Sequence, residues 1–376
     1  MDSQGLSTST SPFSGLRSAV IGTGGISAEH LSFLSGRTVV GDVSDLVNLI
    51  AVCDLSEASA RYAATTYGAS AYFTDIEEML DVVRPDVVHI LTPAHTHHEL
   101  AKRCLLDGVH VLCEKPITPS LTQLEELVKI ASIKNLRVTE SHNYLFNPAV
   151  SQLDRAIADG QFGRVTEVEI RITLPLTDPG GSFADPNLSN PIHNLPAGAL
   201  HDFTTHFASL LLHFAPGVHF DRIAAAWSRH GDDPAFRYDD LDAVVIGEGP
   251  NGVVHGRLRF DSRSGPDCFT VRVRGRQGWG EAELFQPHVR IVRPRTGGSK
   301  LSPVINYLAN GLSEIQSGVR NAGHKLAQRG PYEGLHIMLA ETYQALATGS
   351  DLPIDTDEML AVSGFVDRLL ESDIKL

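Results

Sequence analysis

The order of apolar and polar positions divides the chain into two parts. In the first part, short apolar runs alternate with amphipathic stretches of about ten to fifteen residues, which predicts βαβ units and a parallel sheet. Ligands of such sheets bind at the carboxyl ends of the strands. The expected strands are Leu16–Ile21, Leu49–Val52, Asp86–Leu91, His110–Cys113 and Arg137–Thr139, and the expected helices are Ser56–Thr66, Ile76–Val83, His98–Asp107 and Ser120–Lys134.

After about Pro148 the pattern changes. Closely spaced alternating runs, separated by Gly, Pro and Asn, predict one largely antiparallel sheet. The expected strands are Val165–Leu174, Asp221–Trp227, Ala243–Glu248, Gly252–Phe260, Phe269–Val273, Gly280–Phe285 and Val289–Val292. Helical periodicity marks Ala149–Asp159, Gly198–Phe214, Tyr332–Thr348 and Thr356–Ser372, whereas 294–328 begins as a basic, Gly-rich hinge and continues as a weakly amphipathic segment.

These patterns predict an α/β protein with two domains, because a single core rarely grows past about 250–300 residues. We expect a flexible Ser- and Thr-rich leader at 1–14 and a Rossmann dinucleotide-binding domain at 15–148. Residues 149–376 are expected to form a C-terminal α+β domain for substrate binding and oligomerisation, with a large, mostly antiparallel open sheet. The last helices are candidates for packing back on the first domain.

Charge and cysteine content narrow the class of partner. The chain of 376 residues has a formal net charge of −14, so it lacks the overall positive field that attracts nucleic acid or anionic membranes. Its four cysteines show no C-x-x-C spacing, which is atypical of a disulfide framework or a zinc knuckle. No secretion signal and no membrane-spanning apolar stretch is expected. A cytoplasmic protein acting on a small molecule is therefore the first hypothesis.

A glycine-rich loop follows the first expected strand and precedes a helix. Gly22 permits a tight turn, Gly24 lets the backbone approach a pyrophosphate, and the helix N-terminus offers N–H donors to phosphates. Ser27 occupies the place of the third glycine in the G-x-G-x-x-G pattern and is still small. The cofactor-holding residues expected in this loop are Gly22, Thr23, Gly24, Gly25 and Ile26.

Asp54 ends the second strand, where a carboxylate is placed to accept hydrogen bonds from the ribose hydroxyls of adenosine. A carboxylate there repels a 2′-phosphate, so NAD is favoured over NADP. The alternative is that Asp54 only caps the following helix. The spacing from Gly24 is longer than usual because 35–45 looks like an insertion.

Two further segments lie at strand ends. Thr92-Pro93-Ala94-His95-Thr96-His97 follows the third strand of the first part, and Glu114-Lys115-Pro116 follows the fourth. Both are expected to line one crevice. A lysine just beyond a buried strand is suited to exchange a proton with a substrate hydroxyl, although an ordinary surface lysine beside a turn proline fits the same sequence.

Asp202 and His206 are spaced to share one helix face. The carboxylate is expected to orient the imidazole and raise its pKa, as an acid/base pair requires. A metal site built from His193, His201, Asp202 and His206 is the weaker alternative, because neighbours on a helix point apart and no H-E-x-x-H pattern is present. A capping Asp beside a core His is the third possibility.

Together these segments resemble the glucose–fructose oxidoreductase/inositol dehydrogenase/rhizopine catabolism family, Gfo/Idh/MocA, over roughly residues 16–372. The resemblance implies NAD(P)-dependent oxidation or reduction of a sugar, inositol or related polyol, in homodimers or homotetramers formed through the C-terminal sheet. It implies that Lys115 contacts the reacting oxygen, that His206 is the general acid/base and that Asp202 holds the substrate and His206 in place. It also implies that Thr92, Pro93, His97 and Glu114 line the cofactor.

The resemblance also implies substrate contacts from the segment entering the second domain, with Asn143 and Tyr144 as candidates. Leu145 departs from the family pattern, which often has Arg there. The long loop 178–196 is expected to cover the substrate, with His193 touching it. Two other functions stay open at this point. One is an NAD-dependent glycoside hydrolase, and the other is a non-catalytic NAD-binding regulator.

Overall fold

A computed structural model defines most of the chain. The leader at 1–14, much of the loop expected at 178–196 and most of 294–328 lie outside the described residues. The structure describes residues 15–38, 40–41, 43–178, 183–184, 190–286, 288–293, 304, 307–309, 311–312, 315–316, 318–319 and 332–372. No helix in these ranges is both long and apolar enough to cross a membrane.

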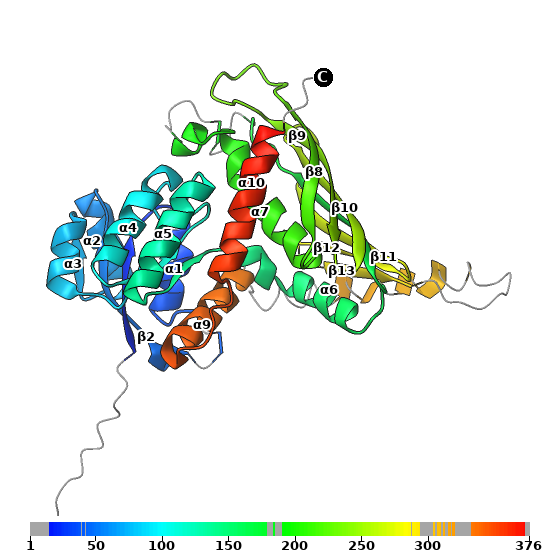
Figure 1. Cartoon of the computed structure of the whole chain (residues 1–376). Helices are drawn as coiled ribbons and strands as arrows, with labels where there is room; N and C mark the ends of the chain where they lie inside the picture. Colours follow the sequence, from blue (N-terminus) through cyan, green and yellow to red (C-terminus); the bar gives the residue numbers. More distant parts are fainter. Residues whose placement is uncertain are drawn as a thin grey trace, which may run out of the picture.

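The N-terminal half is a six-stranded, all-parallel sheet in the order β3-β2-β1-β4-β5-β6 (Figure 1). This confirms the expected Rossmann arrangement, in which successive strands are added on one side of β1 up to β3 and on its other side from β4 onward. The sequence pattern missed β3, which is only three residues long. The elements are β1 Leu16–Ile21, α1 Ser27–Leu34, β2 Val47–Cys53, α2 Glu57–Tyr67, β3 Ala71–Phe73, α3 Ile76–Val83, β4 Val87–Ile90, α4 His97–Leu106, β5 His110–Cys113, α5 Leu121–Lys134 and β6 Val138–Glu140, with short 3-10 turns η1 Ser44–Leu46, η2 Ala94–Thr96 and η3 Asn143–Phe146.

Local chemistry sets the ends of these helices. Ser56 and Asp75 accept hydrogen bonds from the backbone N–H groups three residues later, so they cap α2 and α3. Gly68 ends α2 in the left-handed conformation that glycine adopts without strain. The central strands β1, β4 and β5 are almost wholly buried and apolar, as strands covered on both faces are. Because the strands are parallel, the loops that follow them lie together at one edge of the sheet.

The C-terminal half is a seven-stranded sheet in the order β13-β12-β11-β7-β10-β9-β8. It is mostly antiparallel, as expected, but β7 and β10 run parallel because the chain crosses through α7 and two further strands before β10 pairs with β7. Its elements are α6 Pro148–Ala158, β7 Val165–Thr173, η4 Pro191–Asn194, α7 Ala199–Phe214, β8 His219–Ser228, β9 Asp240–Gly249, β10 Gly252–Asp261, β11 Cys268–Gly275, β12 Trp279–Glu283 and β13 His288–Val292, and two helices follow, α9 Glu333–Thr348 and α10 Thr356–Glu371.

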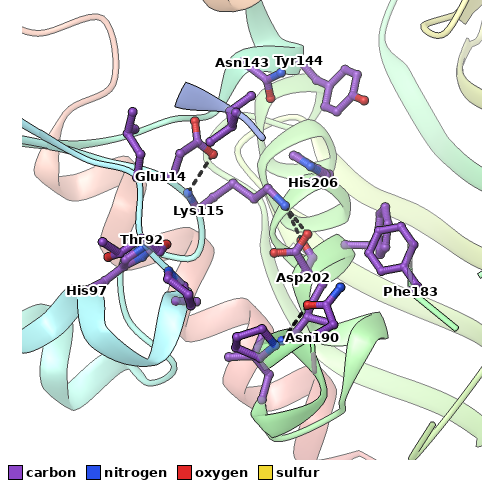
Figure 2. A pocket seen from close by; sticks show the side chains of 18 of the residues that line it. Thr92, His97, Glu114, Lys115, Asn143, Tyr144, Phe183, Asn190, Asp202 and His206 are labelled. Carbon is purple, nitrogen blue, oxygen red and sulfur yellow. Dashed lines mark hydrogen bonds and ion pairs between the residues drawn. The ribbon is translucent and has the colours of Figure 1, made fainter. Parts of the chain in front are cut away.

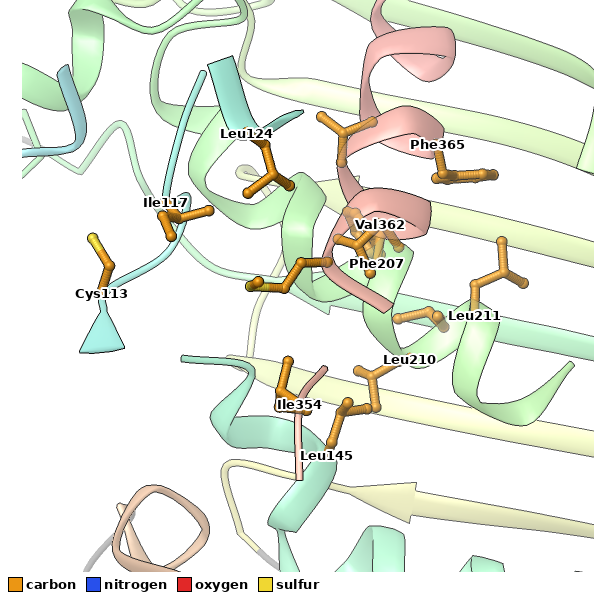
Figure 3. Close-up of a cluster of buried hydrophobic side chains, with 14 of the residues drawn as sticks. Cys113, Ile117, Leu124, Leu145, Phe207, Leu210, Leu211, Ile354, Val362 and Phe365 are labelled. Atoms are coloured by element: carbon orange, nitrogen blue, oxygen red, sulfur yellow. The ribbon is translucent and has the colours of Figure 1, made fainter. Parts of the chain in front are cut away.

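The last helices join the two halves. In Figure 1, α7 and α10 lie between the Rossmann half and the C-terminal sheet, and α9 lies against the Rossmann half near α1. One apolar cluster runs from the Rossmann half through α7 and α10 to the C-terminal sheet, and a second joins α9 to α1 and β1. Figure 3 shows part of the first cluster, with Cys113 and Leu124 from the Rossmann half on one side and Phe207 of α7 and Phe365 of α10 on the other. A continuous core of this kind fixes the edge of the Rossmann sheet against α7, and the site lies there.

Candidate active site

A cavity of about 600 Å³ opens between the carboxyl ends of the Rossmann strands and α7. This volume is in the range of small-molecule sites. Loops of the first half form one wall, and α7 with the loop before it forms the other (Figure 2). The lining residues are Ile26, Leu91, Thr92, Pro93, Ala94, His97, Glu114, Lys115, Asn143, Tyr144, Leu174, Phe183, Asn190, Pro191, Ile192, Leu195, Asp202, Phe203, His206, Phe285 and Tyr332.

The glycine loop fits a dinucleotide. Gly22 has φ +93°, and a Cβ there would lie 2.8 Å from the Thr92 side chain, so only glycine fits this turn. Added Cβ atoms at Gly24 and Gly25 would meet nothing within 4 Å, which leaves the backbone bare toward open space. No side chain caps the N-terminus of α1. A bare loop before an uncapped helix is the cradle that a pyrophosphate requires.

A second hollow of about 510 Å³ borders the same loop, between α1 and α2. It is lined by Thr23, Gly24 and Gly25 on one side and by Ser59 and Tyr62 of α2 on the other. Together the two hollows extend along the glycine loop from the Rossmann edge to α7. The residues present therefore fit an extended dinucleotide across the ends of the strands.

Asp54 braces the glycine loop. One carboxylate oxygen accepts hydrogen bonds from the Thr23 N–H (2.8 Å) and the Thr23 hydroxyl (2.7 Å), and the other accepts from the Ser56 N–H (2.8 Å). Ser56, not Asp54, is the cap of α2 that accepts from Ser59. Asp54 thus fixes the loop directly and places its carboxylate at the end of β2.

Lys115 and Asp202 form an ion pair across the cavity. The Lys115 ammonium donates to the Asp202 carboxylate and, at 3.3 Å, to the Asp202 carbonyl (Figure 2). The ammonium also lies 5.9 Å from the centre of the Phe203 ring. The expectation that Asp202 orients His206 is wrong in this structure, since the carboxylate points to Lys115. The pairing joins the end of β5 to α7.

His206 lies among aromatic rings instead of beside a carboxylate. Its ring packs edge-on against Tyr144 with centroids 4.7 Å apart, and it also contacts Phe203 and Phe269. Burial, followed by the charges of Lys115 and His142, lowers its pKa well below the ordinary value, so the expected rise is also wrong. Nδ1 is buried and finds no partner among the described residues. His206 is therefore a neutral imidazole.

A buried chain of polar side chains supports Glu114 from behind. His30 lies 3.2 Å from the Glu114 carboxylate and, through Nδ1, 2.9 Å from Nδ1 of His89. His89 is 2.9 Å from the Tyr343 hydroxyl, which is 2.6 Å from the Ser18 hydroxyl. Burial would raise the pKa of Glu114, but the His30 hydrogen bond and the Lys115 charge hold it below its usual range. Glu114 therefore stays ionised at the cavity wall.

A second buried histidine lies behind the site. His142 lies 3.2 Å from Glu140 of β6 and 3.4 Å from Glu358 of α10. Burial opposes its charge, yet the two carboxylates raise the pKa of His142 to about 9. Neither this cluster nor the His30 row could be predicted from local sequence, because each includes members from distant segments, such as Glu358 for His142 and Tyr343 for His89.

Most predicted site residues meet at the cavity. Thr92, Pro93 and His97 line the wall beneath the glycine loop, and Asn143 and Tyr144 line the opposite end. His97 lies within hydrogen-bond distance of the Thr92 and Pro116 carbonyls (2.6 and 2.8 Å), which ties η2 to the segment after Lys115.

Three predicted or suspected residues lie elsewhere. The side chain of Leu145 is buried in the apolar core, so its difference from the family pattern does not alter the cavity wall. His193 faces away from the cavity, with Nε2 2.9 Å from the Phe183 carbonyl and its ring against Phe236. His201 borders a different, small hollow. Among the described residues, no three His, Cys, Asp or Glu side chains converge as a metal site requires.

The apolar lining of the cavity was not predicted from the sequence. Phe183, Phe203, Phe285 and Tyr332 come from four separate segments, and nothing in their local patterns distinguishes them from core residues. Only Phe203, next to Asp202 on the predicted helix, had a signal, because it precedes His206 by three positions on the same face.

Comparisons with known proteins agree with this geometry. The sequence profile of an oxidoreductase family with an NAD-binding Rossmann fold, Gfo/Idh/MocA, matches residues 16–142. Inositol 2-dehydrogenase from Rhizobium meliloti (strain 1021) is 30% identical over 285 residues, which are 72% of this chain and 77% of that protein. D-glucoside 3-dehydrogenase from Escherichia coli (strain K12) is 30% identical over 46% of this chain. Matches to the relatives most similar in local sequence span only about a third to a half of those proteins' length.

The whole fold recurs in solved structures. Levoglucosan dehydrogenase in complex with NADH superposes with a TM-score of 0.76 over 95% of this chain and 96% of that chain, at 18% identity. This likeness extends the comparison beyond the Rossmann half to the C-terminal sheet. The chain belongs to the Gfo/Idh/MocA family of oxidoreductases, with an NAD-binding Rossmann fold at residues 16–142.

Proposed function

We propose that the protein is an NAD-dependent dehydrogenase that transfers a hydride between nicotinamide and a hydroxyl-bearing carbon of a sugar, inositol or related polyol. The observation that carries this proposal is the meeting of Lys115, Asp202 and His206 in one cavity beside the glycine loop. The names of two relatives, inositol 2-dehydrogenase and D-glucoside 3-dehydrogenase, support the substrate class.

Bound NAD supplies the hydride acceptor, and the protein supplies orientation and proton transfer. The Lys115 ammonium, held by Asp202, donates a hydrogen bond to the reacting oxygen and stabilises the negative charge that develops there. The neutral His206 accepts the hydroxyl proton on Nε2, because Nδ1 is closed off in the protein. In the reverse direction the same imidazole returns the proton.

The residues proposed to hold NAD are those of the two hollows. The loop from Gly22 to Ile26 receives the pyrophosphate, and Asp54 faces the adenosine ribose, where its charge disfavours a 2′-phosphate. The residues proposed at the nicotinamide end are Thr92, Pro93, His97, Glu114 and Lys115.

The dehydrogenase is favoured over the two alternatives. Inositol 2-dehydrogenase, D-glucoside 3-dehydrogenase and levoglucosan dehydrogenase, to which the chain is similar, are all named as dehydrogenases. Intact Lys115, Asp202 and His206 also argue against a protein that has lost turnover. Oxidation of a screened sugar with external NAD distinguishes the cases, because NADH accumulates only with a dehydrogenase.

Assembly and location are part of the same proposal. We expect a homodimer or homotetramer formed through the C-terminal sheet, and a reducing compartment such as the cytoplasm. All four cysteines are free thiols, which fits such a compartment. Size-exclusion chromatography with light scattering tests the assembly, and a monomer at micromolar concentration would contradict it.

The test of the proposed activity is a spectrophotometric screen of neutral sugars, inositols and their glycosides with NAD at alkaline pH. Alkaline solution draws off the proton that oxidation releases, so it favours NADH formation. At least one compound is expected to reduce NAD. A protein that binds NAD but reduces it with none of the panel would contradict the proposal.

A further inference from the structure

The charges around the cavity select against an anionic substrate. Among the described lining residues, Lys115 is the only Lys or Arg, and its ammonium is already paired with Asp202. Glu114 adds a second carboxylate on the same wall. His206 brings no positive charge, because burial lowers its pKa well below the ordinary value, and both ring nitrogens of His97 already face the carbonyls of Thr92 and Pro116. The described wall therefore has more negative than positive charge.

The described residues of the loop before α7 add no cation to the cavity. Asn190, Pro191 and Ile192 of this loop line it. A carboxylate or phosphate on the substrate would therefore meet Glu114 and Asp202 without an unpaired Lys or Arg among the described lining residues, which costs binding free energy.

The wall next to the reacting groups is aromatic and aliphatic. Phe183 and Phe203 lie with ring centroids 6.3 Å apart, and Figure 2 shows Phe183 beyond Asp202 as seen from Lys115. Ile192 and Leu195 extend this apolar wall. Phe203 also packs on Phe260 of the sheet, with centroids 5.0 Å apart, which fixes its ring.

The apolar wall is held in place from behind. His193 lies 2.9 Å from the Phe183 carbonyl, and its ring packs against Phe236. The η4 turn, from Pro191 to Asn194, contacts η2 of the Rossmann half across the cavity. Lys115 and His206 lie at the edge of this wall beside Phe203, and with Asn143 they are polar groups available to substrate hydroxyls.

We infer that the substrate is a neutral hydroxylated ring with an apolar face or apolar substituent against Phe183, Phe203 and Ile192. Uronates, sugar phosphates and nucleotide-linked sugars are excluded as preferred substrates. The inference rests on the proposed function and specifies its substrate class. The C–H face of a ring or an aromatic aglycone packs on the Phe wall, while the hydroxyl to be oxidised points to Lys115 and His206.

The test is a panel in which several ring configurations each appear as the methyl glycoside, the phenyl glycoside, the uronate and the 6-phosphate. Initial rates with NAD give kcat/KM for each. We expect a neutral form to be best, with the phenyl glycoside about three- to tenfold above the methyl glycoside. The charged forms are expected about tenfold to a hundredfold lower.

A charged form with the highest kcat/KM would overturn this inference and leave the proposed dehydrogenase standing. A methyl glycoside equal to or better than the phenyl glycoside would overturn the apolar part of it. If no member of the panel reduces NAD although NAD binds, the proposed function fails, and this inference fails with it.

A variant pair tests the charge selection separately. Ile192→Arg places a cation on the apolar wall and is expected to raise kcat/KM for the uronate relative to its neutral counterpart by about tenfold. Ile192→Gln, of similar size but neutral, is expected to leave that ratio unchanged. Circular dichroism and the urea-unfolding midpoints of both variants, compared with those of the wild type, show that they fold. An equal ratio in the two variants would contradict selection by charge.

Discussion

The two walls of the cavity differ in how their polar groups are satisfied. On the Rossmann side, Asp54, Glu114 and His97 are all held by hydrogen bonds from the protein itself. On the α7 side, His206 lies among aromatic rings with one nitrogen unpartnered among the described residues. The first wall is thus set to receive a cofactor of fixed shape. On the second wall, the His206 imidazole is available to the substrate, because Asp202 is paired with Lys115 and not with His206.

The largest effect that separates the two walls is expected at His206. His206→Asn removes the proton acceptor and is expected to lower kcat by about 10²- to 10⁴-fold. The matched control is His201→Asn, because His201 is also buried on α7 but borders a different hollow. Steady-state rates with the best panel substrate measure both. Equal losses in the two variants would show that His206 acts only as a structural residue.

The pH dependence of the unfolding free energy also distinguishes two buried histidines, because the pKa of His142 is raised and that of His206 is lowered. His142, with a folded pKa of about 9, binds its proton more tightly than the unfolded chain does. Its contribution, on the order of 3 kcal/mol, is complete below the unfolded value near 6.5 and is lost as pH rises through about 9. His206, whose pKa is lowered, contributes above about 6.5, and that contribution is lost as pH falls.

Urea unfolding across both windows measures these two effects. In Glu358→Gln, one of the two carboxylates that hold the His142 proton is lost, so the decline toward alkaline pH is expected to become shallower. The acid decline should remain. A wild-type stability that does not fall between about pH 6.5 and 9 would contradict the His142 assignment.

Tyr343 belongs to the buried row of hydrogen-bonded side chains that supports Glu114 through His89 and His30, so replacing it tests whether this row stabilises the fold. Tyr343→Phe leaves His89 and Ser18 without their shared hydroxyl partner and is expected to cost about 1–3 kcal/mol of unfolding free energy. The control Tyr62→Phe removes an exposed hydroxyl on α2 and should cost almost nothing. Thermal or urea unfolding measures both. A loss below about 0.5 kcal/mol in Tyr343→Phe would show that the row is not needed for stability.

The smallest expected effect is on cofactor choice. Asp54→Asn removes the charge near the ribose and is expected to narrow the preference for NAD over NADP by about tenfold, or about 1.4 kcal/mol. Asp75→Asn is the control, since Asp75 caps α3 and is expected to leave the ratio unchanged. Titration of each cofactor by fluorescence gives the ratio. An unchanged ratio in Asp54→Asn would leave Asp54 with only its bracing of Thr23.

Local sequence was sufficient for the Rossmann wall. The loop from Gly22, Asp54 and Lys115 each follow a strand whose apolar pattern is clear, and parallel strands bring their ends to one edge. The sequence also predicted the α7 helix, but not how its side chains pair. Helical spacing suggested that Asp202 would bond to His206, whereas Asp202 forms an ion pair with Lys115 of the Rossmann half.

The rest of the site depends on contacts between distant segments. Phe183, Phe203 and Tyr332 converge only after α7 docks on the Rossmann edge, and the His30–His89–Tyr343 chain joins α1, β4 and α9. The burial that lowers the pKa of His206 is likewise a property of the packed rings, not of its neighbours in sequence. Patterns along the chain carry no information about such packing.

The central claim is that Lys115 contributes far more to the reaction than to the binding of NAD. The most direct measurement is kcat together with the Kd for NAD in Lys115→Ala. The control is Lys102→Ala, a surface lysine paired with Glu126. The account predicts a loss of kcat of about a thousandfold in Lys115→Ala, an NAD Kd within about threefold of the wild type, and no change in Lys102→Ala. Activity that survives in Lys115→Ala, or a loss of activity explained entirely by lost NAD binding, would contradict it.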